Sequence, residues 1–173
     1  MSAEAIHLLI AAETPPPAAG ETALTGRARV GGGRGEGAPV TRMLLSPHPI
    51  AAPPVEGEIR WSGARVARVG LVEIANATAL LCNFLEVADE AEEEFNAWYD
   101  TEHLPRLGAL PGVSGIARYR SDASPRYLAL FTLAGSDIPA GEAWRTAART
   151  PWTARIKRFT RGYHSFLFTP ASL

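Results

Sequence analysis

Aromatic residues are distributed very unevenly along this chain of 173 residues, and this distribution strongly constrains its fold. Of the 14 aromatic residues (4 Trp, 4 Tyr and 6 Phe), only Trp61 lies before residue 84. Prolines show the opposite bias, since 8 of 14 fall within the first 54 residues. Large aromatic side chains bury the most area per residue and dominate small cores. We therefore expect the main core to form from residues after 80.

Residues 1–77 contain apolar runs separated by strong helix breakers. The runs at 6–12, 40–45 and 66–74 are rich in aliphatic or β-branched residues and predict strands. Proline and glycine clusters between them leave no room for an amphipathic helix. We predict three or four strands with long loops, either as a degenerate second copy of the C-terminal fold or as a partly disordered extension. Long Gly/Pro loops are uncommon inside compact domains, which keeps the second alternative open.

Residues 78–173 predict a regular succession of elements. The expected order is a strand at 80–87, a helix at 89–104, strands at 114–120 and 126–133, helices at 140–148 and from 150 onward, and a strand at 163–168. Asp89 and Glu92 have the spacing of a capping box, and Pro105 predicts that the first helix ends at Leu104. Thr150 and Pro151 suit the N-cap and first position of the last helix.

The order β-α-β-β-α-β predicts an α+β, ferredoxin-like fold, a four-stranded antiparallel sheet with both helices on one face. The other face must also be covered, because the strands carry too much apolar surface to leave one face wet. The residues that supply this surface include Leu81, Leu85, Tyr127, Ala129 and Phe131. Two such sheets commonly pack face to face. We therefore expect either a homodimer or an intrachain pseudo-dimer closed by residues 1–77.

The apolar face of the helix at 89–104 ends in a carboxylate. At about 100° per residue, one arc holds the side chains of Ala91, Phe95, Trp98, Tyr99 and Glu102. A buried carboxylate is costly unless it is paired. In the structural interpretation, Glu102 accepts a hydrogen bond or pairs with an arginine such as Arg106, Arg118 or Arg120. In the functional interpretation, Glu102 or His103 has a shifted pKa and moves a proton on a ligand.

His103 is the candidate acid/base residue because an unperturbed histidine titrates near neutral pH. Asp100, three residues earlier on the helix, lies within reach to orient it. A histidine near a helix C-terminus also complements the helix dipole, which is the purely structural alternative. Trp98 and Tyr99 supply a surface for a planar or apolar ligand. His164, on the final strand, either lines the same cavity or is a core histidine.

Charge and composition argue against several other functions. The net charge of −1 does not favour nucleic acid or an anionic membrane. No run of about 20 apolar residues is present, and the start lacks a basic segment, so we expect no membrane span, no signal peptide and a cytoplasmic location. Cys82 is the single cysteine, and the four histidines lack metal-ligand spacing. The glycine run at 31–35 precedes no helix, so we expect neither a metal nor a cofactor.

Several consecutive motifs resemble one known family. Residues 95–105, Phe-Asn-Ala-Trp-Tyr-Asp-Thr-Glu-His-Leu-Pro, resemble the F-x-x-W-Y-x-x-E-H-x-P helix of EthD-like dimeric α/β-barrel proteins. The segments Leu-Pro-Gly-Val at 110–113, Ala-Arg-Tyr-Arg at 117–120 and Pro-Arg-Tyr-Leu-Ala-Leu-Phe at 125–131 follow in the order of that family. The resemblance covers about residues 78–168, and residues 1–77 depart from it.

The resemblance implies a ferredoxin-like fold whose sheets pair into a barrel with a cleft. The wider superfamily includes cofactor-free monooxygenases, cyclases and dehydratases of aromatic polyketides, lactone isomerases and haem-dependent enzymes. By analogy, His103 would be the acid/base, Glu102 or Asp100 would orient it, and Arg118 or Tyr127 would stabilise an enolate. We expect a cofactor-independent enzyme acting on an apolar or aromatic small molecule. The alternative is a non-catalytic ligand-binding or assembly protein with the same helix.

Overall fold

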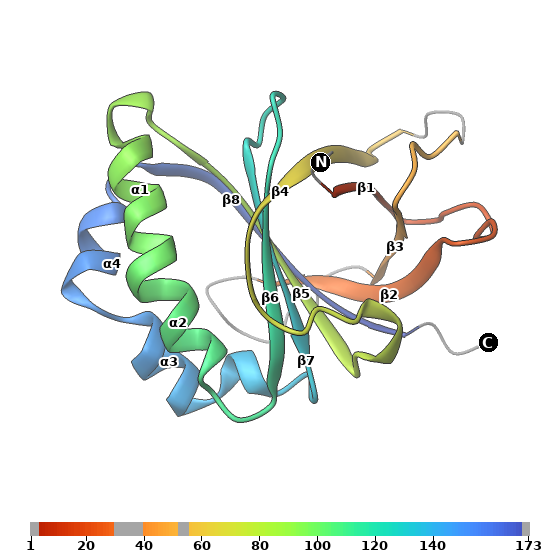
Figure 1. Cartoon of the computed structure of the whole chain (residues 1–173). Helices are drawn as coiled ribbons and strands as arrows, with labels where there is room; N and C mark the ends of the chain where they lie inside the picture. The colour runs from red at the N-terminus through yellow and green to blue at the C-terminus, as the bar shows by residue number, and fades with distance from the viewer. Residues whose placement is uncertain (1–3, 30–39, 52–55, 171–173) are drawn as a thin grey trace.

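Eight antiparallel strands form a closed barrel within the single chain (Figure 1). The computed structural model describes residues 4–29, 40–51 and 56–170. The strands are β1 (Ala5–Ala11), β2 (Thr22–Arg29), β3 (Val40–Ser46), β4 (Ile59–Gly70), β5 (Ala79–Val87), β6 (Val113–Arg120), β7 (Tyr127–Leu133) and β8 (Thr160–Pro170). Their order around the barrel is β1-β3-β2-β8-β5-β7-β6-β4. Closure therefore pairs strands from both halves of the sequence.

The α-helices all lie on the outside of the barrel, against the strands of the second half (Figure 1). They are α1 (Glu92–Trp98), α2 (Leu104–Gly108), α3 (Glu142–Ala148) and α4 (Pro151–Ile156). A π-helical turn, Tyr99–His103, joins α1 to α2. Short 3-10 turns occupy Ile74–Asn76, Asp89–Ala91 and Ile138–Ala140. In the described part of the chain, no helix is long and apolar enough to cross a bilayer.

The two halves of the barrel have the same strand order. The second half runs β8-β5-β7-β6 and the first half runs β4-β1-β3-β2, so each places its fourth, first, third and second strand side by side. They meet where β2 pairs with β8 and where β4 pairs with β6. The predicted ferredoxin-like arrangement of the second half is confirmed. The cover of its second face, which the sequence left open, comes from the N-terminal strands of the same chain.

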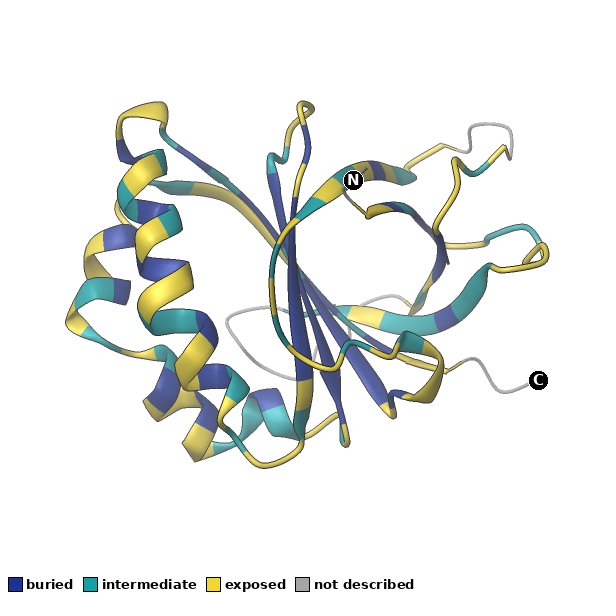
Figure 2. Cartoon of the chain, in the orientation of Figure 1, coloured by how far each residue is buried: buried dark blue, intermediate teal, exposed yellow. Residues whose placement is uncertain are grey.

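Strands β5, β6 and β7 are buried along most of their length (Figure 2). Alternation along the strands divides the apolar residues between two cores. Leu81, Leu85, Tyr127, Ala129 and Phe131 lie between the sheet and the helices. The residues that alternate with them face the barrel interior, which is filled by side chains from both halves; they include Ile6, Leu8, Met43, Leu80, Phe84, Leu130 and Phe168. The barrel interior is therefore a packed core.

At β2, the barrel seam depends on a glycine. Gly26 pairs with Phe168 on β8, and a Cβ at this position would lie 2.2 Å from the carbonyl oxygen of Leu167. Only hydrogen fits there, so the absent side chain permits the close approach of the two strands. Sequence reasoning did not predict β2, because this segment has small and polar residues rather than an apolar run.

The predicted strands agree broadly with β1, β3 and β5 to β8, but three local predictions need correction. The strand expected at 66–74 instead runs Ile59–Gly70. The capping box at Asp89 is wrong, because no side-chain cap bond forms at either the 3-10 turn or α1. The helix end at Leu104 is also wrong, since α2 continues through Pro105. The wide π-helical turn before Pro105 accommodates its ring and its missing N–H. The N-cap at Thr150 is confirmed, since its Oγ1 accepts from the Thr153 N–H at 3.0 Å.

Candidate functional site at the helix–sheet junction

The π-helical turn Tyr99–His103 presents most of the predicted site residues. In this turn the N–H of Leu104 reaches back to the carbonyl of Tyr99, one residue further than in an α-helix. Such turns are rare and often occur at functional sites. The Trp98 and Tyr99 rings are buried against the sheet, whereas Asp100 is exposed and His103 is half-buried. One short segment therefore carries side chains into the core and out to solvent.

Arg118 lies beneath this turn, at the centre of β6. Its side chain is only 2% exposed, and it is the one arginine in the core of the described residues. The guanidinium donates to Asn96 Oδ1 at 2.8 Å and to Asp100 Oδ1 at 3.2 Å. Its carbon lies 4.0 Å from the centre of the Tyr99 ring and 5.2 Å from that of Tyr127. A buried cation is thus held by an amide, a carboxylate and aromatic faces.

A second polar group adjoins Arg118 through Asn96. The Asn96 amide donates to the Tyr127 hydroxyl at 3.3 Å, and that hydroxyl donates to Glu92. The hydrogen bond from Tyr127 lowers the pKa of Glu92, with Arg126 and Arg120 adding to the effect and partial burial opposing it. Burial and the neighbouring carboxylate raise the pKa of Tyr127, so it keeps its proton at neutral pH. We call the π-helical turn together with Glu92, Asn96, Arg118 and Tyr127 the helix–sheet junction. It holds a protonated phenol that is connected to the buried guanidinium through the Asn96 amide.

His103 packs against aromatic rings rather than against an acid. Its ring centre lies 4.2 Å from that of Trp98 and 5.2 Å from that of Tyr99. Burial, followed by the positive charges of Arg118 and Lys157, lowers the pKa of His103 to about 3. At neutral pH the imidazole is therefore uncharged. The sequence predicts that Asp100 orients His103. In the structure, Asp100 pairs with Arg118 instead.

Glu102 connects two helices. It is half-buried and accepts a hydrogen bond from the hydroxyl of Thr150, the N-cap residue of α4. This contact matches the hydrogen-bonded form of the structural interpretation, with a threonine in place of the arginines considered. The contact therefore joins the π-helical turn to the N-terminus of α4.

The structure brings most of the predicted residues together but leaves out His164. Trp98, Tyr99, Asp100, Arg118 and Tyr127 are linked by the contacts given above. His164 is exposed on β8, where it pairs with Phe84, so its interpretation as a core histidine is wrong. Sequence reasoning missed Asn96 and Glu92. Their spacing is a usable signal, because Glu92, Asn96 and Asp100 follow one another at intervals of four residues and so lie on one side of the helix.

The indole nitrogen of Trp98 is buried without a hydrogen-bond partner among the described residues. Such unpaired donors are rare in native proteins, and each marks a place where a water or another polar group would be favourable. The Trp98 ring lies against His103, within the same turn. The unpaired donor is therefore part of the candidate site.

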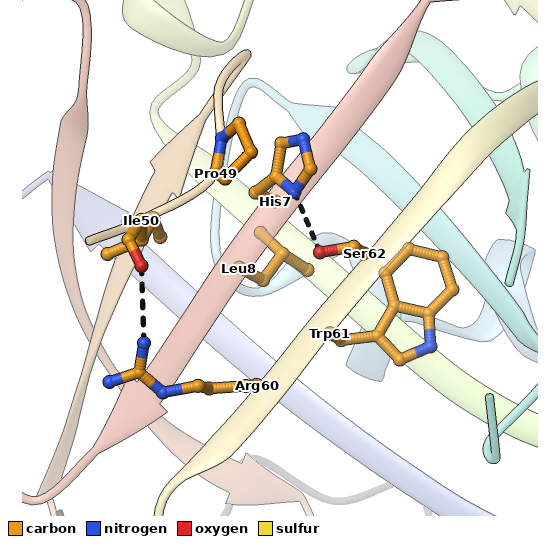
Figure 3. A pocket seen from close by; sticks show the side chains of 7 residues that line it. All are labelled: His7, Leu8, Pro49, Ile50, Arg60, Trp61 and Ser62. Carbon is orange, nitrogen blue, oxygen red and sulfur yellow. Dashed lines mark hydrogen bonds between the residues drawn. The ribbon is translucent and has the colours of Figure 1, made fainter. Parts of the chain in front are cut away.

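Two hollows lie elsewhere on the barrel. The smaller, about 120 Å³, is lined by His7, Leu8, Pro49, Ile50, Arg60, Trp61 and Ser62 (Figure 3). There His7 Nδ1 lies 2.7 Å from Ser62 Oγ, across the β1–β4 pair. The other, about 300 Å³, is lined by residues of β2, β3 and β8 and by Ser136. Neither includes a residue of the helix–sheet junction. In the described residues, no group of three or more His, Cys, Asp or Glu could hold a metal.

Solved structures with this architecture cover almost the whole chain. An uncharacterised ferredoxin-fold protein related to antibiotic biosynthesis monooxygenases, from Listeria monocytogenes, has a TM-score of 0.60 at 10% identity, over 100% of this chain and 97% of its own. The heme-degrading enzyme LmHde from Listeria monocytogenes has a TM-score of 0.58 at 9% identity, over 96% and 99%. A protein described as a major regulator of staphylococcal pathogenesis has a TM-score of 0.58 at 7% identity, over 97% and 99%.

These similarities establish the fold and nothing finer, because the identities are at most 10%. The chain therefore has a ferredoxin-like fold, as the first of these structures does. No protein family model matches the sequence, and no curated protein sequence does. The resemblance to EthD-like proteins therefore stays a prediction from the motifs.

Proposed function

We propose that this chain binds and acts on an apolar or aromatic small molecule at the helix–sheet junction, with Arg118 as the polar anchor. The observation that carries this proposal is the buried guanidinium, which lies among aromatic rings beneath a π-helical turn. Burying a charge is costly, and replacing a whole buried ion pair by apolar side chains is often neutral or stabilising. The presence of an arginine at this position therefore supports a role beyond packing.

The chemistry proposed is proton transfer at a carbon next to a carbonyl, as in cyclases, dehydratases, isomerases and cofactor-free oxygenases. Arg118 would stabilise the enolate oxygen, and Tyr127 would donate a second hydrogen bond by turning its single O–H from Glu92 to the ligand. His103 would be the base, with Trp98 and Tyr99 as walls of the site. Burial, and after it the charges of Arg118 and Lys157, keep the pKa of His103 at about 3, so the imidazole would act as an uncharged, weak base. The names of two structural neighbours, a monooxygenase relative and a heme-degrading enzyme, agree with small-molecule chemistry.

Binding of 2-naphthoate, a flat aromatic acid, tests this proposal. We expect the wild-type protein to bind 2-naphthoate, followed by titration calorimetry, and Arg118→Met to lose at least about tenfold in affinity, because a charge-assisted contact is worth about 1.5–3 kcal/mol. Arg120→Met, on the same strand but half exposed, is the matched control and should bind as the wild type does. Equal binding by both variants would contradict the proposed anchor.

A second candidate is a non-catalytic ligand-binding or assembly protein. The packed barrel interior favours it, as does the description of one structural neighbour as a regulator. His103→Asn separates the two candidates once a converted substrate is known. The enzyme hypothesis requires loss of conversion with binding retained, whereas retention of full conversion would remove His103 from the mechanism.

We also propose that residues 1–77 are a degenerate copy of the ferredoxin-like unit at 78–173. The repeated strand order of the two halves supports this, as does the antiparallel pairing shared by them. In this proposal the barrel is an intrachain pseudo-dimer whose α-helices, among the described residues, all belong to the second half. The EthD-like relationship and a further pairing into a homodimer both remain predictions. Sedimentation velocity at micromolar concentration would distinguish monomer from dimer.

A further inference from the structure

We infer that Asp100 is a built-in substitute for the ligand's acidic group, so that the site selects small molecules bearing a carboxylate or enolate. The inference rests on the proposed function, because it concerns the same anchor, Arg118. It adds a substrate class and a mechanism of entry. The acidic group of the ligand would replace Asp100 at the guanidinium, and Asp100 would turn into solvent.

The charge balance around Arg118 supports this role. Among the described residues, the carboxylate that binds this guanidinium is Asp100, and the other hydrogen-bonding partner, Asn96, is neutral. Glu92, the next carboxylate on the same helix, is bound by Tyr127, Arg126 and Arg120. A buried cation requires a paired anion. An empty site must therefore carry its own anion, and Asp100 provides it.

The position of Asp100 makes it replaceable. Its side chain is 54% exposed, whereas that of Arg118 is 2% exposed, so one carboxylate connects the buried charge to solvent. The pair is joined by a single hydrogen bond of 3.2 Å, in contrast to the 2.8 Å bond from the same guanidinium to Asn96. Asp100 also belongs to the π-helical turn rather than to regular helix. Asp100 can therefore leave the guanidinium for solvent while the Arg118–Asn96 hydrogen bond stays in place.

The geometry also defines the rest of the ligand. Guanidinium groups bind carboxylates through two parallel N–H donors, so a planar acid would make a stronger contact than the single bond that Asp100 makes. The rings of Tyr99 and Tyr127 already lie against the guanidinium. These rings are only 4% and 2% exposed, so an aromatic or apolar body attached to the acid would lie where Asp100 now lies, at their solvent-facing edge. The inferred class is therefore aromatic or apolar acids, including ketones held as enolates.

The test compares 2-naphthoate with 2-naphthamide, a neutral molecule of the same shape, on the wild-type protein and on Asp100→Asn. We expect Asp100→Asn to bind 2-naphthoate about fivefold more tightly, since an ion pair worth about 1 kcal/mol no longer competes. Its affinity for 2-naphthamide should not change. Asp122→Asn is the matched control. Asp122 makes a 3.2 Å bond to Arg120, which lies on the same strand as Arg118, but Asp122 is fully exposed. It should alter neither affinity.

The outcomes distinguish failure of the role inferred for Asp100 from failure of the proposed binding site at Arg118. Unchanged or weaker binding of 2-naphthoate by Asp100→Asn overturns the inference that Asp100 occupies the place of the ligand's acidic group. Arg118 remains the proposed anchor in that case if Arg118→Met still loses binding. Equal tightening of both probes also overturns it, because the variant would then only have loosened the turn. Failure of both probes to bind either protein overturns the proposed function itself. Asp100→Ser repeats the comparison should Asp100→Asn not fold, as judged by circular dichroism.

Discussion

The guanidinium of Arg118 lies 4.0 Å from the centre of the Tyr99 ring while it donates a hydrogen bond to Asp100 at 3.2 Å. These two contacts place one buried cation between a core aromatic ring and a solvent-facing carboxylate of the same helical turn. The cation thereby links the packed interior of the helix–sheet junction to its surface.

Arg118→Met should fold as stably as the wild type while losing the ligand. Methionine has a similar length. Removing one partner of a buried ion pair usually costs about 3–5 kcal/mol, but the carboxylate left behind here, Asp100, is 54% exposed and can be hydrated. We expect the free energy of unfolding in urea to change by less than about 1 kcal/mol. A loss of more than about 3 kcal/mol would show instead that the arginine is a structural requirement.

Protonation of His103 should lower the free energy of unfolding in mild acid. Its pKa is lowered from 6.5 to about 3 in the folded state, so the unfolded chain binds the proton more tightly. The stabilisation is therefore complete above pH 6.5 and is lost as the pH falls toward 3. Between pH 7 and pH 5 the free energy of unfolding should drop by about 2 kcal/mol through this residue. His103→Asn should remove this drop, whereas His164→Asn, at an exposed histidine, should retain it.

Gly26→Ala should weaken the seam between the halves of the barrel. The added Cβ would meet the Leu167 carbonyl oxygen at 2.2 Å, and backbone cannot yield as a flexible side chain can. Overpacking of this kind typically costs about 1–3 kcal/mol. Thr25→Ala, at the neighbouring position of β2, should cost less than about 1 kcal/mol. Urea unfolding followed by tryptophan fluorescence measures both, and a stable Gly26→Ala would contradict closure of the barrel by this pairing.

Thr150→Ala should destabilise α4 and release Glu102 at the same time. The Thr150 hydroxyl caps the helix through the Thr153 N–H and donates to Glu102. Loss of an N-cap costs about 1 kcal/mol, and the freed carboxylate adds to it. Thr146→Ala, at an exposed position of α3, is the control. If Glu102 is structural, Glu102→Gln should leave ligand affinity unchanged; a loss of affinity greater than tenfold would give it a place in the site.

The second half of the fold was predictable because local signals and packing agree there. Apolar alternation at β5, β7 and β8 and the aromatic helix are consistent with one another, so the β-α-β-β-α-β order could be derived. The strand β2 was not predictable, since Thr22–Arg29 has little apolar character and is held by its two neighbours. Its requirement for Gly26 arises from a strand 142 residues later in the sequence, which no local window contains.

The candidate site was predictable in its location but not in its connections. The spacing of Trp98, Tyr99 and His103 predicted an aromatic turn against the sheet. The partners of the polar residues in this turn depend on the register of the strands beneath it. Asp100 was assigned to His103 by helical spacing, and the pairing of β6 beneath the π-helical turn gave it to Arg118 instead. The π-helical turn itself, and with it the continuation through Pro105, has no clear sequence signature.

A crystal structure of the protein with 2-naphthoate would test the central claim most directly. We expect the carboxylate of the ligand to lie within hydrogen-bonding distance of the Arg118 guanidinium, with the Asp100 side chain turned away from it. Density for 2-naphthoate only in the hollow beside His7 and Ser62, with the Arg118–Asp100 bond intact, would contradict it.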